Sequence, residues 1–149
     1  MQAKDLDIAR ERLKQKNLAL AIAKNGKVIF ETSSRGIGGL LRAVEELERE
    51  IENSAVADKI VGKAAALLCV HAGVSAVFAV TASERGIQSL KENNVLCRFE
   101  NRVPHILNPD RSDICPFEKL VINISNPREA YEKLKSLAAE KGLYEERFS

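Results

Sequence analysis

The sequence predicts a layered α/β domain whose β-sheet opens with a hairpin. Three observations carry this prediction. Asn25-Gly26 separates two apolar runs, and this dipeptide suits the positive backbone angles of a tight hairpin turn. The run VSAVFAV at 74–80 is continuously apolar, as in a central strand covered on both faces. Apolar residues at helical spacing flank these strands, so helices and strands share one core.

The N-terminal part of the chain supplies a helix, the hairpin and a second helix. Residues 4–15 place apolar side chains at helical spacing among charges. The two hairpin strands are expected at 18–23 and 27–32. A flexible turn, SSRGIGG at 33–39, then leads into a helix over 40–51, which has one apolar stripe.

The remaining elements follow from apolar runs and from residues that start or stop helices. A largely buried helix is expected at 57–71 with Gly73 as its stop, followed by the strand at 74–80. Ser83 suits the start of a helix that ends near Asn93. The other expected elements are a strand at 95–107 with a bend at 100–102 and a break at Pro104, a short helix from Cys115 to before Asn123, and a last helix from Asn126-Pro127 to Gly142.

Length and composition indicate one globular domain over residues 1–149. Hydrophobic residues make up 45% and charged residues 30% of the chain. The net charge is only +2, and basic residues alternate with acidic ones, so no nucleic-acid partner is expected. A homo-oligomer is compatible with this composition.

The cysteines and the apolar segments bear on the compartment. Three cysteines at wide spacing are typical of reduced thiols, so we expect a cytoplasmic protein. The charged N-terminus does not look like a signal peptide. The mostly apolar stretch at 64–82 is interrupted by His71 and Gly73, which favours a buried helix followed by a buried strand over a membrane span. No membrane contact is therefore expected.

The segment ADKIVGKAAALL is the first candidate ligand site. Asp58 and Lys59 are expected to open the buried helix, with Gly62 and Lys63 one turn on. A helix N-terminus attracts anions, and lysines at i and i+4 lie on one face. The alternative is that Lys59 and Lys63 only extend along an apolar helix into solvent.

The turn SSRGIGG is a second candidate for holding an anion. Ser34 and Gly36 belong to a run of small residues whose backbone N–H groups precede a helix. The Gly-Lys-Ser/Thr ending of a P-loop is absent, and a plain loop explains the segment more simply.

The segment RSDICPFEKL at 111–120 is the third candidate. Cys115 at a helix start, with Lys119 nearby, is the arrangement in which a thiolate nucleophile is stabilised. Glu118 or Asp113 would then carry protons. The alternative is structural: Asp113 caps the helix, Pro116 starts it, and Glu118 reaches back to the cap.

The cysteines and histidines of the chain do not predict a zinc site. The thiols and imidazoles are Cys69, His71, Cys97, His105 and Cys115, without the close pairs of structural zinc sites. Cys69 and His71 are expected at the far end of the predicted helix, roughly 15–20 Å from Asp58. No cofactor is expected either.

The motifs DKIVGKAAALL, GVSAVFA and DICPFEKLV, together with the hairpin, resemble the domain of unknown function 1893 family of prokaryotic proteins. The resemblance covers roughly residues 18–125. It implies a three-layer, cytidine-deaminase-like fold, with a mixed sheet between helices. In deaminases, two helices open with His or Cys plus Glu, and with Pro-Cys-x-x-Cys. The comparable positions here hold Asp58 to Lys63 and Cys115 to Glu118, so the zinc ligands of that chemistry are not preserved.

Together these observations predict a binding domain for a small anionic or nucleotide-like ligand. The pocket is expected where the helix starts at Asp58 and Cys115 face each other. The ligand-binding candidates are Ser34, Gly36, Asp58, Lys59, Gly62, Lys63 and Lys119, and the catalytic candidates are Cys115, Glu118 and Asp113. The alternatives are an enzyme with Cys115 as nucleophile, or a divergent deaminase-like hydrolase.

Overall fold

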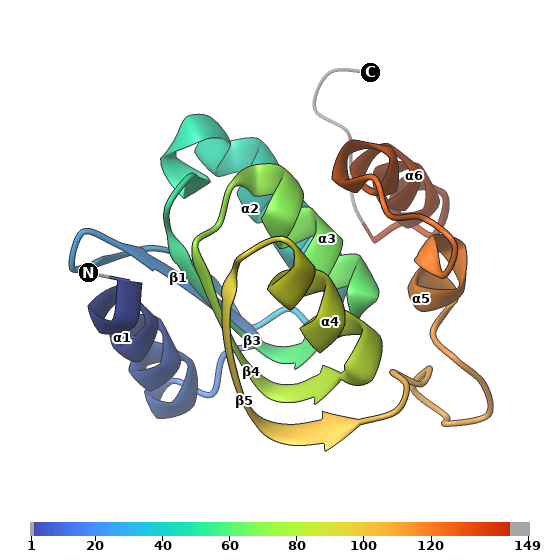
Figure 1. Ribbon diagram of the computed structural model, residues 1–149, viewed down its shortest axis with the longest axis horizontal. Coiled ribbons are helices and arrows are strands. Elements are labelled where there is room, and N and C mark those ends of the chain that lie inside the picture. The colour runs from blue at the N-terminus through green and yellow to red at the C-terminus, as the bar shows by residue number, and fades with distance from the viewer. Residues whose placement is uncertain (1, 144–149) are drawn as a thin grey trace.

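The computed structural model describes residues 2–143 of the chain. It consists of α-helices, one short 3₁₀ helix (η1) and five β-strands (Figure 1). In chain order these elements are α1 Gln2–Gln15, β1 Leu20–Lys24, β2 Lys27–Thr32, α2 Ile37–Leu47, η1 Glu48–Ile51, β3 Ala55–Val61, α3 Lys63–Ala72, β4 Ala76–Ser83, α4 Glu84–Glu92, β5 Leu96–Val103, α5 Pro116–Val121 and α6 Pro127–Glu140.

The five strands form one mixed sheet in the order β2-β1-β3-β4-β5. Strand β1 is antiparallel to both β2 and β3, whereas β3, β4 and β5 are parallel to one another. The hairpin between β1 and β2 turns at Asn25 and Gly26, both with positive φ (53° and 82°). The carboxylate of Asp5 in α1 accepts hydrogen bonds from both turn N–H groups, at 3.1 and 2.8 Å. The predicted mixed sheet and its opening hairpin are confirmed.

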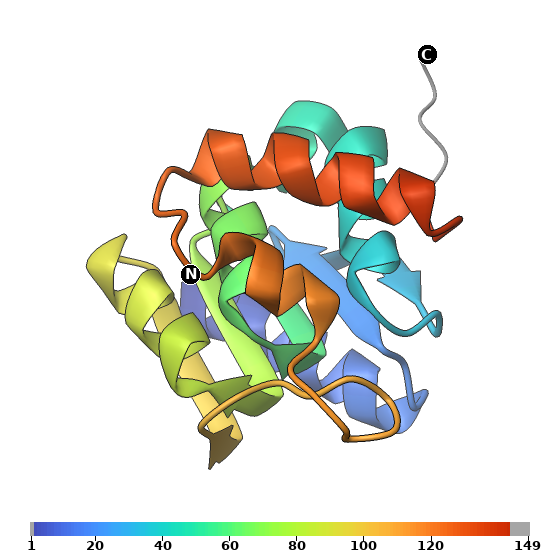
Figure 2. The ribbon, with the colours of Figure 1, turned by 90° about the vertical axis from the view of Figure 1, so that its right-hand side faces the viewer.

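Helices cover both faces of the sheet (Figure 1). Helix α1 lies on one face, where Leu6, Ala9 and Leu13 pack with small sheet residues and Phe78. Helices α2, α3 and α4 cover the other face and bury a larger core. Helices α5 and α6 pack outside α3, away from the sheet (Figure 2). The fold thus has the predicted helix–sheet–helix layers, with this pair added on one side.

The single helix expected at 57–71 is wrong, because this stretch contains strand β3 and then helix α3. Residue Ala57 pairs with Ala21 of β1 and with Phe78 of β4, so it lies at the centre of the sheet. A strand buried on both faces has no reason to alternate apolar and polar residues, and its apolar run merged with that of the helix. Gly62, in an extended conformation (φ −102°, ψ −168°), separates the two elements.

Several other bounds and one expected bend also differ from expectation. The residues 100–102, expected to bend, lie inside β5, which ends where Pro104 cannot donate to a ladder. The helix expected from residue 40 begins three residues earlier, at Ile37. The stretch 64–82 does form a buried helix followed by a buried strand. Within residues 2–143, no helix has the length and apolarity needed to cross a membrane.

Candidate functional site

The N-termini of three helices meet one edge of the sheet. Strands β3 and β4 end at Val61 and Ser83, and helices α3 and α4 begin directly after them. Strand β2 runs in the direction of β3, because both are antiparallel to β1, so α2 begins at this edge too. In open α/β sheets, ligands bind outside the carboxyl ends of the strands. The fold therefore favours a ligand site at this edge, which is called the carboxyl edge below.

The starts of α3 and α4 are packed against each other. A Cβ atom on Gly86 would lie 2.9 Å from both the carbonyl carbon of Gly62 and the carbonyl oxygen of Val61. Only glycine allows this backbone approach. The hydroxyl of Ser83 accepts a hydrogen bond from the Gly86 N–H at 3.0 Å and so caps α4, as its sequence predicts.

The start of α3 is capped by a carboxylate from α5. Glu118 accepts hydrogen bonds from the backbone N–H groups of Lys63 and Ala64, both at 2.9 Å. A Cβ atom on Gly62 would lie 2.4 Å from Glu118 Oε1, so the absence of a side chain at position 62 makes room for the cap. The helix expected to start at Asp58 starts at Lys63, and Glu118 from the segment after Cys115 supplies the anion at this helix start, in place of the pocket expected between the two helix starts.

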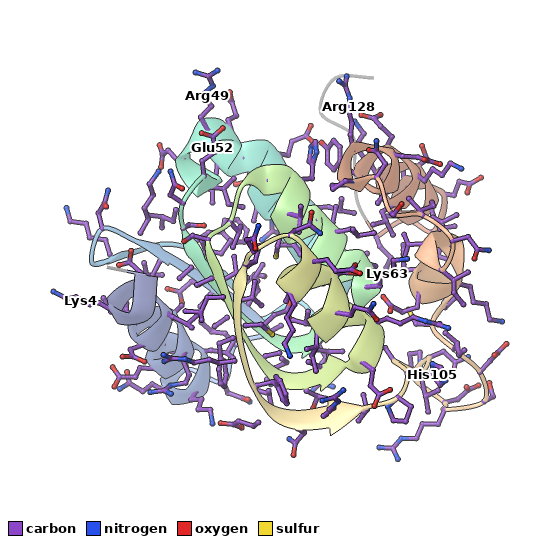
Figure 3. All side chains as sticks on the ribbon, viewed as in Figure 1. Lys4, Arg49, Glu52, Lys63, His105 and Arg128 are labelled. Carbon is purple, nitrogen blue, oxygen red and sulfur yellow. The ribbon has the colours of Figure 1, made fainter. Side chains whose placement is uncertain are left out.

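A cleft opens beside this cap, between α3 and α4. It has a volume of about 190 Å³ and brings together Lys63 of α3 and Arg85 of α4. The Lys63 Nζ donates a hydrogen bond to the carbonyl oxygen of Ile122 at 3.1 Å, on the α5 side of the helix (Figure 3). Arg85 is exposed and takes part in none of the ion pairs found among residues 2–143. The remaining lining residues are Leu67, Gln88, Ser89, Glu92, Asn93 and Ser125.

Lys59 lies away from this cleft. It is in β3, and its Nζ donates to Asn17 Oδ1 at 2.9 Å, at the end of α1. The expected pairing of Lys59 with Lys63 on one helix face is therefore wrong. The second cation of the cleft is Arg85, at the start of α4. The sequence indicated this position only through the helix start predicted at Ser83.

Asp58 is also in β3 rather than at a helix start. Burial raises the pKa of its carboxyl group to about 7, although the backbone N–H groups of Ile60 and Lys59 favour the charged form. Burial and the nearby Asp58 charge together raise the pKa of the Cys69 thiol. Asp58 and Cys69, expected 15–20 Å apart along one helix, thus lie near each other, because β3 folds back onto α3.

The turn that contains Ser34 and Gly36 precedes α2, as predicted, and lies at the carboxyl edge of the sheet. Both Ser34 and Gly36 are exposed. The Ser34 N–H donates to Thr32 Oγ1 at 3.1 Å, and Gly36 has a φ of 91°, in the region that favours glycine. No side-chain cap is formed at the start of α2.

The residues around Cys115 are engaged with other partners. Lys119 pairs with Asp113, and this hydrogen bond lowers the pKa of the Asp113 carboxyl group. Asp113 accepts from the N–H of Ile114 and does not cap α5, so the structural alternative is wrong for this residue. Cys115 occupies the cap position without a side-chain hydrogen bond, half-buried, before a helix of six residues. The three charged residues expected to act with the thiol, Asp113, Glu118 and Lys119, are thus bonded to other groups.

A second hollow, which the sequence did not indicate, lies at the other end of α3. This groove of about 510 Å³ is bordered by η1, α2 and α6. The His71 ring stacks on Tyr131, with centroids 4.4 Å apart, and burial lowers the pKa of His71. Its charged lining residues are Glu45, Glu48, Glu52 and Lys135. Across residues 2–143, no three or more His, Cys, Asp and Glu side chains are grouped so as to hold a metal ion.

Comparison with known proteins identifies the relatives of this chain. The family model described as Domain of unknown function (DUF1893) matches residues 8–137. The crystal structure of a DUF1893 family protein from Thermotoga maritima aligns with a TM-score of 0.79 and 28% identity, over 85% of each chain. No curated protein matches significantly.

More distant structures show the fold alone. Two forms of RibD from Acinetobacter baumannii align with TM-scores of 0.51 and 0.50 at 12% identity. The alignments cover 66% and 67% of this chain but only 36% of RibD. The predicted deaminase-like fold is therefore confirmed. A shared fold does not imply a shared activity, so the activity of RibD is not assigned to this chain. From the match over residues 8–137, the chain belongs to the DUF1893 family.

Proposed function

We propose that this protein binds a small anionic ligand in the cleft between α3 and α4. The observation that carries the proposal is the convergence of Lys63 and Arg85 on one cleft at the carboxyl edge of the parallel strands. Two cations from neighbouring helices, with one acidic residue, Glu92, in the same lining, favour a negatively charged occupant. Polar side chains of Gln88, Ser89 and Asn93 offer hydrogen bonds for its orientation.

The ligand charge would be bound by side chains more than by helix ends. Glu118 occupies the first N–H groups of α3, and the Ser83 hydroxyl occupies that of Gly86. The guanidinium of Arg85 can hold a carboxylate or phosphate through two parallel hydrogen bonds, and Lys63 adds a point charge. The predicted role of Lys63 is kept in this proposal, and Arg85 replaces Lys59.

The size of the cleft narrows the ligand class. Pockets for drug-sized ligands have volumes of about 300–1,000 Å³, whereas this cleft has about 190 Å³. A phosphate group or the carboxylate end of a small metabolite is the fitting size. A nucleotide would place its phosphate in the cleft and leave its base outside.

The enzymatic alternatives have less support. A Cys115 nucleophile needs a neighbouring base or cation, and Glu118, Lys119 and Asp113 are bonded elsewhere. A deaminase-like hydrolase needs thiol or imidazole ligands at the helix starts. Helices α3 and α4, which begin at the carboxyl edge, open with Gly62-Lys63-Ala64 and Ser83-Glu84-Arg85, which contain neither. The rate at which iodoacetamide modifies Cys115 tests the nucleophile alternative.

A thermal-shift screen at low ionic strength tests the proposal. The probes are inorganic phosphate, phosphosugars, nucleotides and dicarboxylates. A probe at about 100 times its Kd adds about 2.7 kcal/mol, which corresponds to a rise in Tm of roughly 5–10 °C for a chain of this size. We expect Lys63→Ala and Arg85→Ala each to abolish most of the rise.

Control variants remove one positive charge outside the cleft. Lys91 is exposed near the end of α4, Lys59 is bonded to Asn17, and Arg49 lies far from Lys63 (Figure 3). Their replacement by Ala should leave the rise in Tm unchanged. Absence of a shift with every anion, or an equal shift in the cleft variants and these controls, would contradict the proposal.

A further inference from the structure

Strand β5 forms an open edge of the sheet. It has eight residues, and within residues 2–143 its only partner strand is β4. Six of the eight side chains are exposed, and Figure 1 shows no helix or strand beyond β5 at this border. The opposite edge strand, β2, is mostly half-buried, with Arg42 over the Phe30 ring and Arg12 paired with Glu31. Of the two edges, β5 is therefore the one available to another chain.

The side chains in the middle of β5 divide by charge between the two faces. Arg98 and Glu100 lie on the face covered by α1, as the pairing of Glu100 with Lys14 of that helix shows, whereas Arg102 pairs with Glu84 at the start of α4. Cys97 and Phe99 lie on the other face, opposite Val77 and Ala79 of the α3–α4 core.

Along β5 the backbone N–H and C=O groups point alternately towards β4 and towards the open edge. The N–H of Leu96 donates to Ser75, towards β4. Because the direction alternates along a strand, Cys97, Phe99 and Asn101 direct their N–H and C=O groups to the open edge. An antiparallel partner would form its hydrogen-bonded pairs with these three residues.

We propose that a second copy of this chain pairs with β5, antiparallel, about a two-fold axis at Phe99. In this register Phe99 lies opposite the partner's Phe99, and Arg98 lies opposite the partner's Glu100. The same two-fold axis places Glu100 opposite the partner's Arg98, so one surface is complementary to itself. The two five-stranded sheets become one continuous sheet.

Charge selects this register over its neighbours. An axis at Arg98 or at Glu100 would place identical charges opposite each other, which destabilises a strand pair. An axis at Asn101 would set Glu100 against the partner's Arg102, but β5 ends at Val103, so only residues 99–103 would be paired, compared with residues 96–102 for the axis at Phe99. The axis at Phe99 pairs most of the strand and covers an aromatic ring that is 37% exposed.

Charged residues on an edge strand often prevent pairing. Repulsion of this kind requires like charges to meet. Arg98 and Glu100 have opposite signs and lie on the same face, so they oppose every register except a complementary one. Arg98 takes part in no ion pair among residues 2–143, which leaves it available to a partner.

Sedimentation velocity of the full chain, from micromolar to near-millimolar concentration, tests this interface. We expect a concentration-dependent dimer for the wild type and monomers for Arg98→Glu and for Glu100→Arg. The double variant, Arg98→Glu with Glu100→Arg, should dimerise again, although it lacks the pairing of Glu100 with Lys14. A monomeric wild type, single variants that dimerise like it, or a double variant that stays monomeric would each overturn the proposal.

Cross-linking gives a second measurement that does not depend on these charges. In a hydrogen-bonded antiparallel pair the Cα atoms are about 5.5 Å apart, which suits a disulfide. In a background with Cys97→Ser and Cys115→Ser, oxidation should join Phe99→Cys chains across the axis. Leu96→Cys, opposite the partner's Arg102, should not be joined. Equal cross-linking of both variants, or of neither, would overturn the register.

Discussion

The carboxylate of Glu118 accepts a hydrogen bond of 2.9 Å from the backbone N–H of Lys63. A second bond of the same length comes from Ala64. Gly62, at the cap position, has no side chain, so α3 takes its cap from α5. This contact anchors α5 to the start of α3, the helix that contributes Lys63 to the cleft.

Removal of this cap should destabilise the fold. We predict that Glu118→Ala lowers the free energy of unfolding by about 1–2 kcal/mol, because two N–H groups lose a charged acceptor. Glu118→Gln keeps one oxygen acceptor and should lose less. Urea unfolding measures both, with the exposed Glu11→Gln on α1 as control, expected within about 0.5 kcal/mol of wild type. Equal stability of Glu118→Ala and this control would show that the cap adds nothing.

The Asp58 carboxyl group should make stability depend on pH. Its pKa is about 7 in the folded chain and near 3.8 without burial. Between these values the folded state holds a proton that the unfolded state has released, so stability falls as pH rises from about 4 to about 7. Each pKa unit is about 1.4 kcal/mol.

Asp58→Asn isolates this effect from other acids. The variant carries no proton at this position, so the stability of the wild type relative to Asp58→Asn should decrease steadily across that window and level off above it. Urea unfolding at a series of pH values measures the difference. Parallel profiles for the two proteins would mean that the Asp58 carboxyl group has its ordinary pKa.

Because the starts of α3 and α4 approach closely, any side chain at position 86 should destabilise the fold. We predict that Gly86→Ala costs about 1–3 kcal/mol, since its Cβ would meet the backbone of Val61 and Gly62 at 2.9 Å. The higher helix propensity of alanine, worth up to about 1 kcal/mol, offsets only part of this. Lys91→Ala, exposed on the same helix, is the comparison. An unfolding midpoint for Gly86→Ala at or above that of Lys91→Ala would refute the packing argument.

The three cysteines should differ in reactivity. Cys69 is buried, and burial and Asp58 raise its thiol pKa, so iodoacetamide should not modify it until the chain unfolds. Burial also raises the pKa of Cys97, which should react more slowly than free cysteine at neutral pH. Mass spectrometry of variants with a single cysteine measures each rate. Modification of Cys115 faster than free cysteine would favour the nucleophile hypothesis over the binding proposal.

Most elements of the fold could be predicted from local signals. Asn25-Gly26 fixed the hairpin, Ser83 marked the start of α4, and Asn126-Pro127 marked that of α6. These signals depend on a few neighbouring residues, so they can be seen in the sequence. Strand β3 could not be separated from α3, because its apolar residues are buried by strands and helices distant along the chain.

The site was predicted only in part for the same reason. Lys63 and Glu118 were identified as candidates, and the structure brings their segments together. Their actual relationship, a cap from α5 on α3, depends on the tertiary fold. Arg85 was missed because nothing near it in the sequence shows that α4 begins beside α3. Because residues 55–61 form a strand, Asp58 and Lys59 lie in the sheet and not at the helix start where they were expected.

Mapping of a bound anion by NMR tests the central claim most directly. Uniformly ¹⁵N-labelled protein is titrated with inorganic phosphate and with the best anion from the thermal screen, at constant ionic strength. The account predicts that the largest amide shifts occur in the first turns of α3 and α4 and near Ser125, and that Arg85→Ala abolishes them. Shifts centred on the groove beside His71 and Tyr131, or none beyond those caused by sodium chloride, would contradict it.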